Sequence, residues 1–187
     1  EERPMNLCRQ RMAMRLMLGL WFAALFSASS AFANSISGQA SVVDGDTLGI
    51  QGIHIHLFGV DAPESSQLCR RSDEVQYQCG VQAAHQLEAF IANRAVTCSP
   101  VDQDGGGATV ATCSVNGTDL GDWLVRNGLA FDQPEVSEWR YHDAQLEAEH
   151  AARGIWNGLA VRPWRYRDCI AQHGKPADCS DEPSSHP

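Results

Sequence analysis

A short predicted hairpin with an acidic segment at each end is the feature that most constrains this chain. Residues 47–50 and 53–60 are apolar-rich runs that flank Gln51-Gly52, a dipeptide typical of a tight turn between antiparallel strands. Asp44-Gly45-Asp46-Thr47 leads into the first strand, and Asp61-Ala62-Pro63-Glu64 follows the second. Side chains alternate between two faces of the second strand, one formed by Ile53, Ile55 and Leu57 and the other by His54, His56 and Phe58.

The remaining pattern predicts a mixed α+β domain. Further strands are expected at residues 35–43, 95–99 and 109–115, and helices at residues 81–92, 119–127 and 137–153. Residues 65–80 form a polar loop between the hairpin and the first helix. This pattern alone supports an α+β fold with a small barrel or sheet.

Residues 1–33 have the composition of a secretion signal. Arg9, Arg11 and Arg15 form a basic start, residues 16–26 form an apolar run too short to span a bilayer, and Ala31-Phe32-Ala33 has the small-x-small pattern of a cleavage site. We expect cleavage after Ala33, export to the periplasm or beyond, and no membrane attachment afterwards. An uncleaved anchor is the alternative.

The chain is acidic, with a formal net charge of −9. Loss of residues 1–33 would remove four arginines and two glutamates and bring the charge to −11. Lys175 is the one lysine. Proteins that bind nucleic acids usually present a basic face. Binding of DNA or RNA by this chain would therefore rest on a local site and a metal ion.

Six cysteines follow residue 33, and an even number in an exported chain indicates disulfides. Proximity along the sequence favours local bonds over the other pairings. The expected pairs are Cys69–Cys79, Cys98–Cys113 and Cys169–Cys179. A zinc–thiolate site is the alternative, which the lack of any Cys-x-x-Cys pair and the oxidising compartment disfavour.

Several motifs stand in the order found in the staphylococcal nuclease (thermonuclease) family, and the chain resembles its secreted bacterial branch over residues 42–156. They are Val43-Asp44-Gly45-Asp46-Thr47, Gly59-Val60-Asp61-Ala62-Pro63-Glu64, Leu124-Val125-Arg126-Asn127-Gly128-Leu129-Ala130 and Gly154-Ile155-Trp156, with Pro163-Trp164 and the paired cysteines in addition. The resemblance implies an α+β fold built on an OB-fold, a five-stranded Greek-key β-barrel, with three helices. We expect this domain at residues 34–167 and a polar tail at residues 168–187.

The same resemblance implies a calcium site that hydrolyses phosphodiester bonds in DNA or RNA. Asp46 and Asp61 would be the metal carboxylates, because calcium prefers hard oxygen ligands. Glu64 would orient or deprotonate the attacking water. Asp44 and Thr47 would lie beside the site.

The basic half of the site departs from the family. The two positions where the family carries phosphate-binding arginines hold His56 and Ala108. An arginine that neutralises a phosphoryl transition state can contribute ~10³-fold or more in rate. We therefore expect impaired turnover, with His56 as the catalytic candidate left at its position. Arg70, Arg71 or Arg140 could bring positive charge from elsewhere in the fold.

Alternatives exist for both the metal and the function. His54 and His56 share a strand face, and with the nearby aspartates they would suit a transition metal in place of calcium. Without its arginines the chain could instead be a degenerate nuclease-fold protein that binds a metal or a partner without cleaving. The sequence decides neither whether the protein is an enzyme nor its oligomeric state.

Overall fold

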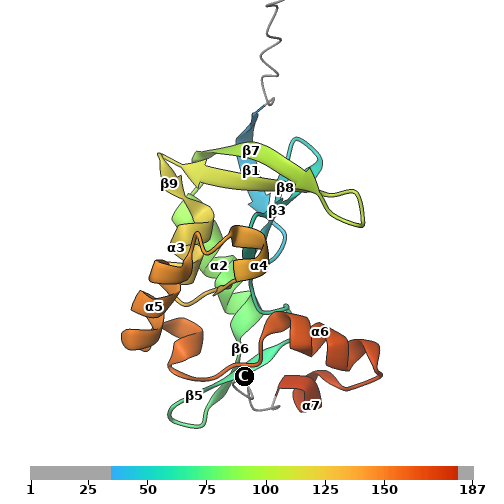
Figure 1. The fold of residues 1–187 in the computed structure, drawn as a ribbon, viewed down its shortest axis with the longest axis vertical. Helices are drawn as coiled ribbons and strands as arrows, with labels where there is room; N and C mark the ends of the chain where they lie inside the picture. Colours follow the sequence, from blue (N-terminus) through green and yellow to red (C-terminus); the bar gives the residue numbers. More distant parts are fainter. Residues whose placement is uncertain (1–34, 181–187) are drawn as a thin grey trace, which may run out of the picture. The chain divides into compact units, whose positions relative to one another are not determined.

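The computed structural model describes residues 35–180, and the predicted signal peptide lies outside them. Five strands form the barrel: β1 (Ile36–Val42), β2 (Thr47–Ile50), β3 (Ile53–Leu57), β7 (Ala95–Gln103) and β8 (Thr109–Val115). They follow the order β3-β2-β1-β7-β8 with antiparallel neighbours. Figure 1 labels β1, β3, β7 and β8 in the upper part of the view. Parallel pairing of β3 with β8 closes the barrel. The expected five-stranded barrel is therefore confirmed.

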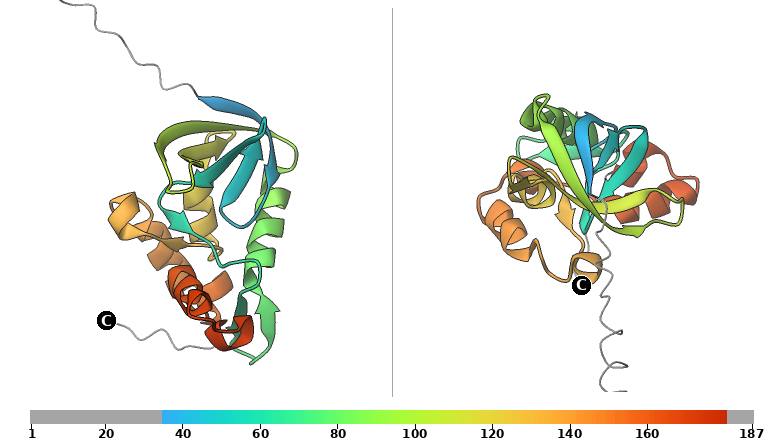
Figure 2. Two further views of the ribbon diagram at one scale, coloured as in Figure 1. Left: turned by 90° about the vertical axis from the view of Figure 1, so that its right-hand side faces the viewer. Right: turned by 90° about the horizontal axis from the view of Figure 1, so that it is seen from above.

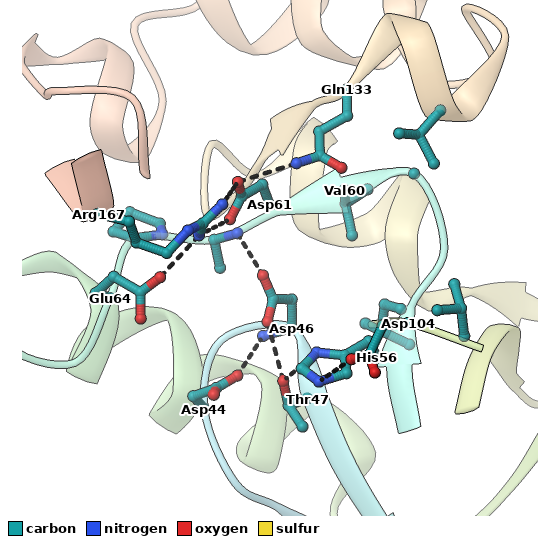
Figure 3. A pocket seen from close by; sticks show the side chains of 16 residues that line it. Asp44, Asp46, Thr47, His56, Val60, Asp61, Glu64, Asp104, Gln133 and Arg167 are labelled. Carbon is teal, nitrogen blue, oxygen red and sulfur yellow. Dashed lines mark hydrogen bonds and ion pairs between the residues drawn. The ribbon is translucent and has the colours of Figure 1, made fainter. Parts of the chain in front are cut away.

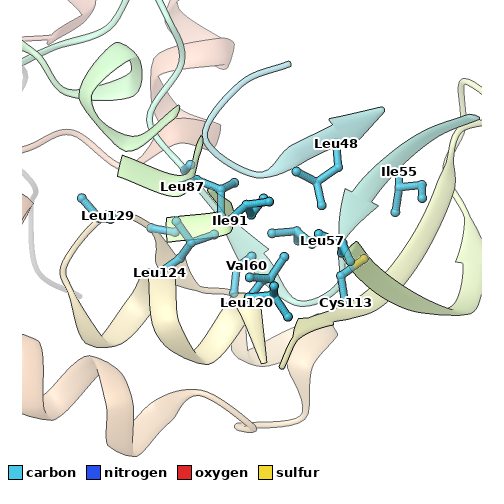
Figure 4. Packing of buried hydrophobic residues seen from close by; sticks show 14 of the residues in the cluster. Leu48, Ile55, Leu57, Val60, Leu87, Ile91, Cys113, Leu120, Leu124 and Leu129 are labelled. Atoms are coloured by element: carbon cyan, nitrogen blue, oxygen red, sulfur yellow. The ribbon is translucent and has the colours of Figure 1, made fainter. Parts of the chain in front are cut away.

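The predicted β2–β3 hairpin is present, with its turn at Gln51-Gly52. Both turn residues have positive φ angles, 52° and 80°, which is the geometry of a two-residue type I′ turn. Ile50 pairs with Ile53 on either side of it. The register places Leu48, Ile50 and Ile55 in the core, where each is fully buried. Figure 4 shows Leu48 and Ile55 within this cluster.

Two of the predicted helices occur close to their expected bounds. Helix α2 (Cys79–Ile91) buries Ala83, Leu87 and Ile91 at the three- and four-residue spacing of one helix face. Helix α3 (Leu120–Arg126) begins after Asp119, whose side chain accepts hydrogen bonds from the backbone N–H groups of Gly121 and Asp122. Figure 2 shows both helices beneath the barrel.

The prediction of one long helix at residues 137–153 is wrong, because two separate helices occur in this part of the chain. They are α4 (Pro134–Ser137) and α5 (His142–His150). Glu138 and Trp139 have φ angles of 55° and 66°, which no right-handed helix accommodates. Ser137 donates a 2.6 Å hydrogen bond to the buried carboxylate of Asp132. This bond ties the end of α4 to β10 (Phe131–Asp132), and the helical periodicity of the sequence did not indicate it.

A second, smaller sheet and the last two helices lie outside the barrel. Residues 65–80, predicted as a loop, contain a short hairpin that pairs with a later strand in a three-stranded sheet. Two helices follow at the end of the described chain, and the first of them crosses residue 167, the expected end of the domain. The elements not yet given are β4 (Val60–Asp61), β5 (Leu68–Arg71), β6 (Gln76–Gln78), β9 (Thr118–Asp119), η1 (Gly154–Trp156), β11 (Gly158–Leu159), α6 (Pro163–Ala171) and α7 (Pro176–Ser180).

All three expected disulfides are confirmed. Cys98–Cys113 joins paired residues of β7 and β8, Cys69–Cys79 links β5 to the start of α2, and Cys169–Cys179 joins α6 to α7. Within residues 35–180, none of the helices has both the length and the apolar character needed to cross a membrane.

The Cys98–Cys113 bond should stabilise the barrel by lowering the conformational entropy of the unfolded chain. The two cysteines are 15 residues apart, for which the chain-entropy relation gives about 3 kcal/mol. We expect Cys98→Ala with Cys113→Ala to lower the free energy of unfolding by about that amount in urea titrations. A change below about 0.5 kcal/mol would contradict a stabilising role.

Candidate active site

The predicted acidic residues meet in one pocket of about 440 Å³ (Figure 3). Its lining includes six of the side chains that the sequence singled out for the site: Asp44, Asp46, Thr47, His56, Asp61 and Glu64. The barrel strands supply one wall, and residues from α4 and α6 complete it. The pocket therefore joins segments that are far apart in the sequence.

The register of the β2–β3 hairpin sets Asp46 beside the segment that follows β4. Thr47 pairs with His56, and the backbone N–H of Leu57 donates to the carbonyl of Asp46 at 2.9 Å. The Asp46 carboxylate then accepts a hydrogen bond from the backbone N–H of Ala62 at 2.7 Å. This hydrogen bond joins the acidic segment before the hairpin to the acidic segment after it.

Asp46 lies in an environment that disfavours its ionised form. Burial raises the pKa of this carboxyl well above its ordinary value, and the hydrogen bond from Ala62 opposes the rise. The neighbouring carboxylates of Asp44 and Asp61 raise the pKa further. A cation close to Asp46 would relieve this repulsion.

Asp61 is the most buried carboxylate of the pocket, with its side chain 5% exposed. Arg167 of α6 holds it with two hydrogen bonds, from Nη1 to Oδ1 at 2.9 Å and from Nη2 to Oδ2 at 2.7 Å. Gln133 donates a further bond to Oδ2 at 3.0 Å. The buried charge is thus paired in the bidentate geometry that suits a guanidinium and a carboxylate.

Glu64 shares the same arginine. Its Oε1 accepts from Arg167 Nη1 at 2.8 Å, and its side chain is 36% exposed. The backbone of Glu64 packs against Gly80 at the start of α2, where a Cβ atom would lie only 2.1 Å from the Glu64 carbonyl oxygen. Only glycine fits this close approach, so Gly80 fixes the position of the catalytic candidate.

His56 lies at the other side of the pocket from Arg167 and contacts side chains of the site. Its Nδ1 is 3.1 Å from the Thr47 hydroxyl, which donates to Asp46, and its Nε2 is 3.3 Å from Asp104. The backbone N–H groups of Ala108 and Gly106 lower the pKa of Asp104. The loop that carries Ala108 thus places a carboxylate, in place of an arginine, next to His56.

The other positive residues considered from the sequence do not enter the pocket. Arg70 contacts Glu74, Arg71 contacts Asp73, and Arg140 contacts Asp119. Arg167 is the residue that the sequence interpretation missed. It stands 103 positions after Glu64 and beyond the motifs, so only the packing of α6 reveals it.

The donors fit a hard divalent cation by their chemistry, since Asp46, Asp61 and Glu64 all offer carboxylate oxygens. In the structure, however, Arg167 occupies oxygens of two of them. Among residues 35–180, no cluster of three or more His, Cys, Asp or Glu side chains is arranged to hold a metal ion. His54 is not brought to the site either, and lines a separate hollow with Gln39 and Ser41.

The raised pKa of Asp46 predicts a pH-dependent effect of its replacement. The folded protein holds this proton more tightly than the unfolded chain, so ionisation of Asp46 destabilises the fold as pH rises from the ordinary carboxyl range through the raised value. In EDTA, Asp46→Asn should therefore raise the thermal midpoint at pH 7 and raise it less at pH 4. The exposed Asp102→Asn on β7 is the matched control. An equal effect of Asp46→Asn at both pH values would contradict the assignment.

Comparison with known proteins places the chain in the family that its motifs resemble. Residues 54–158 match the family described as staphylococcal nuclease homologue. The chain is 38% identical over 136 residues to the Succinoglycan biosynthesis protein ExoI of Rhizobium meliloti (strain 1021), covering 72% of this chain and 71% of that protein. It is 30% identical over 129 residues to the Probable endonuclease LCL3 of Paracoccidioides brasiliensis (strain Pb03), covering 60% of this chain and 36% of that longer protein.

A further relative, the Probable endonuclease LCL3 of Schizophyllum commune (strain H4-8 / FGSC 9210), is 28% identical over 151 residues, covering 72% of this chain and 50% of the relative. The family match covers more than half of the chain and includes β3, β7 and β8 of the barrel. It also includes Asp61 and Glu64 and ends before Arg167. The chain belongs to the staphylococcal nuclease family.

Proposed function

We propose that the protein is an exported, cation-dependent nuclease that hydrolyses phosphodiester bonds in DNA or RNA. The observation that carries this proposal is the meeting of Asp46, Asp61 and Glu64 in one pocket with a guanidinium. Relatives named as probable endonucleases support the class of reaction. Three disulfides support export, since such bonds persist in oxidising compartments.

The cation in this proposal is calcium, held by Asp46 and Asp61. Both offer the hard oxygen ligands that calcium prefers. When bound, the ion would neutralise charge that develops on the phosphoryl oxygens. Its binding requires that Arg167 share or release oxygens of Asp61, because both of them accept hydrogen bonds from that arginine.

Glu64 is the proposed general base. Its carboxylate faces the pocket, and its side chain is exposed enough to meet a water molecule. The oxygen of that water forms a bond to phosphorus while the bond to the leaving oxygen breaks. Glu64 accepts the proton of the water, and the leaving oxygen takes a proton from solvent. The lack of an arginine at positions 56 and 108 is the reason to expect slow turnover, since an arginine can contribute ~10³-fold or more in rate.

A binding protein without nuclease activity is the second candidate. The loss of both barrel arginines and the net charge of −9 favour it. The relative named for succinoglycan biosynthesis, which is not named as a nuclease, is consistent with a different role. The two candidates differ in one measurable property, the cleavage of a phosphodiester bond.

Cleavage should depend on the carboxylates of the pocket. With purified protein, calcium and a fluorescently labelled oligonucleotide, Glu64→Gln should lower kcat by about 10²-fold or more, because the general base is lost. Asp46→Asn should lower both calcium affinity, measured by calorimetry, and cleavage. Glu88→Gln, on the exposed face of α2, is the control and should match the parent protein. Cleavage that survives both pocket variants would overturn the proposed site.

Added positive charge in the pocket should speed the reaction. His56→Arg with Ala108→Arg should raise kcat/KM by at least ~10-fold, because each guanidinium offers charged, bidentate contacts to phosphate. His54→Arg adds one such charge to the same strand as His56 but outside the pocket, and should have little effect. Equal gains from both changes would show that general attraction, and not placement, limits the rate.

A further inference from the structure

Arg167 is the one Arg or Lys among the described residues that line the pocket. It lies on α6, nine residues beyond the end of the segment that matches the family. Its guanidinium bridges Asp61 and Glu64 (Figure 3). The positive charge that the barrel lacks at positions 56 and 108 is therefore present in the pocket from another element.

The fold holds α6 against the loop that carries Glu64. The fully buried side chain of Gln67 donates a 2.6 Å hydrogen bond to the carbonyl of Val161, just before α6. The hydroxyls of Ser66 and Tyr166 lie 2.8 Å apart. These contacts join the two segments on either side of the pocket, so the backbone that carries Arg167 is fixed relative to Glu64.

A second set of contacts fixes the C-terminal side of α6. The Cys169–Cys179 disulfide, two residues after Arg167, joins α6 to α7. The Ser180 hydroxyl accepts a 2.9 Å hydrogen bond from the backbone N–H of Leu68. Placement on braced secondary structure is what a substrate-binding side chain requires, because small errors of position weaken binding and catalysis.

The guanidinium keeps donors available for a ligand. Both N–H groups of Nη1 and one of Nη2 are used by Asp61 and Glu64. Among contacts with the described residues, the Nε–H and the second N–H of Nη2 have no acceptor, and together they form the edge that binds phosphate bidentately. The side chain is 47% exposed, so solvent reaches it.

We propose that Arg167 is the phosphate-binding arginine of this site, supplied by the C-terminal helix in place of the two barrel arginines. This inference rests on the proposed function. Arg167 touches the substrate phosphate through its free edge and neutralises the charge that builds on the non-bridging oxygens during attack. Glu64, and the oxygens of Asp61 that Arg167 shares with the cation, hold the guanidinium in that orientation.

The test measures binding separately from cleavage. In the Glu64→Gln background, where the amide oxygen can still accept from Arg167, anisotropy of a labelled oligothymidylate with calcium gives Kd. Arg167→Gln should raise Kd at least tenfold, and Arg167→Lys should raise it less, because it keeps the charge and loses the bidentate edge. Arg165→Gln removes the same charge from the same helix and should change Kd by less than twofold.

Cleavage by the variants with Glu64 intact gives the second readout. Arg167→Gln should lower kcat/KM at least 10²-fold. Circular dichroism checks that each variant is folded. If Arg167→Gln unfolds, Arg167→Lys tests the inference in its place. Activity of Arg167→Lys equal to that of the parent protein would overturn a role for the guanidinium. If Arg167→Gln cleaves and binds the oligonucleotide as well as the parent protein does, this inference is overturned and the proposed function stands. A parent protein that binds through Arg167 but cleaves neither DNA nor RNA overturns the nuclease proposal alone.

Discussion

Burial of the Asp61 carboxylate is the constraint on which this site depends. A carboxylate that is 5% exposed must be paired, because an isolated charge in a protein interior is strongly unfavourable. The guanidinium of Arg167 on α6, more than a hundred residues further along the chain, pairs with this carboxylate. The C-terminal helices are therefore part of the site, since their removal would leave Asp61 without its cation.

The barrel contributes the other half of the arrangement through a single hairpin. Its two-residue turn fixes the register of β2 against β3, and that register sets Asp46 against the backbone of Ala62. A shift of β3 by one residue against β2 would turn His56 to the opposite face of the sheet from Thr47. The same hydrogen bonds that form the barrel thus determine which carboxylates meet.

The sequence predicted the elements whose signals are local. Gln51-Gly52 identified the hairpin, the pattern of residues 119–127 identified α3, and the spacing of the cysteines identified the three disulfides. The prediction of one helix at residues 137–153 failed because Glu138 and Trp139 adopt positive φ angles, which its periodicity did not indicate.

Among the site residues, the carboxylates were predicted because they lie in compact motifs. Arg167 was not predicted, because its partners Asp61 and Glu64 lie 106 and 103 positions earlier and no periodic pattern links them.

A crystal structure of the protein with calcium and a non-cleavable dinucleotide tests the account most directly, through the distance between the Arg167 guanidinium and the bound phosphate. We expect two hydrogen bonds from Nε and Nη2 to phosphate oxygens, with the phosphate in the pocket of Asp46 and Glu64. A phosphate bound outside this pocket, with Arg167 contacting only the carboxylates, would contradict the account.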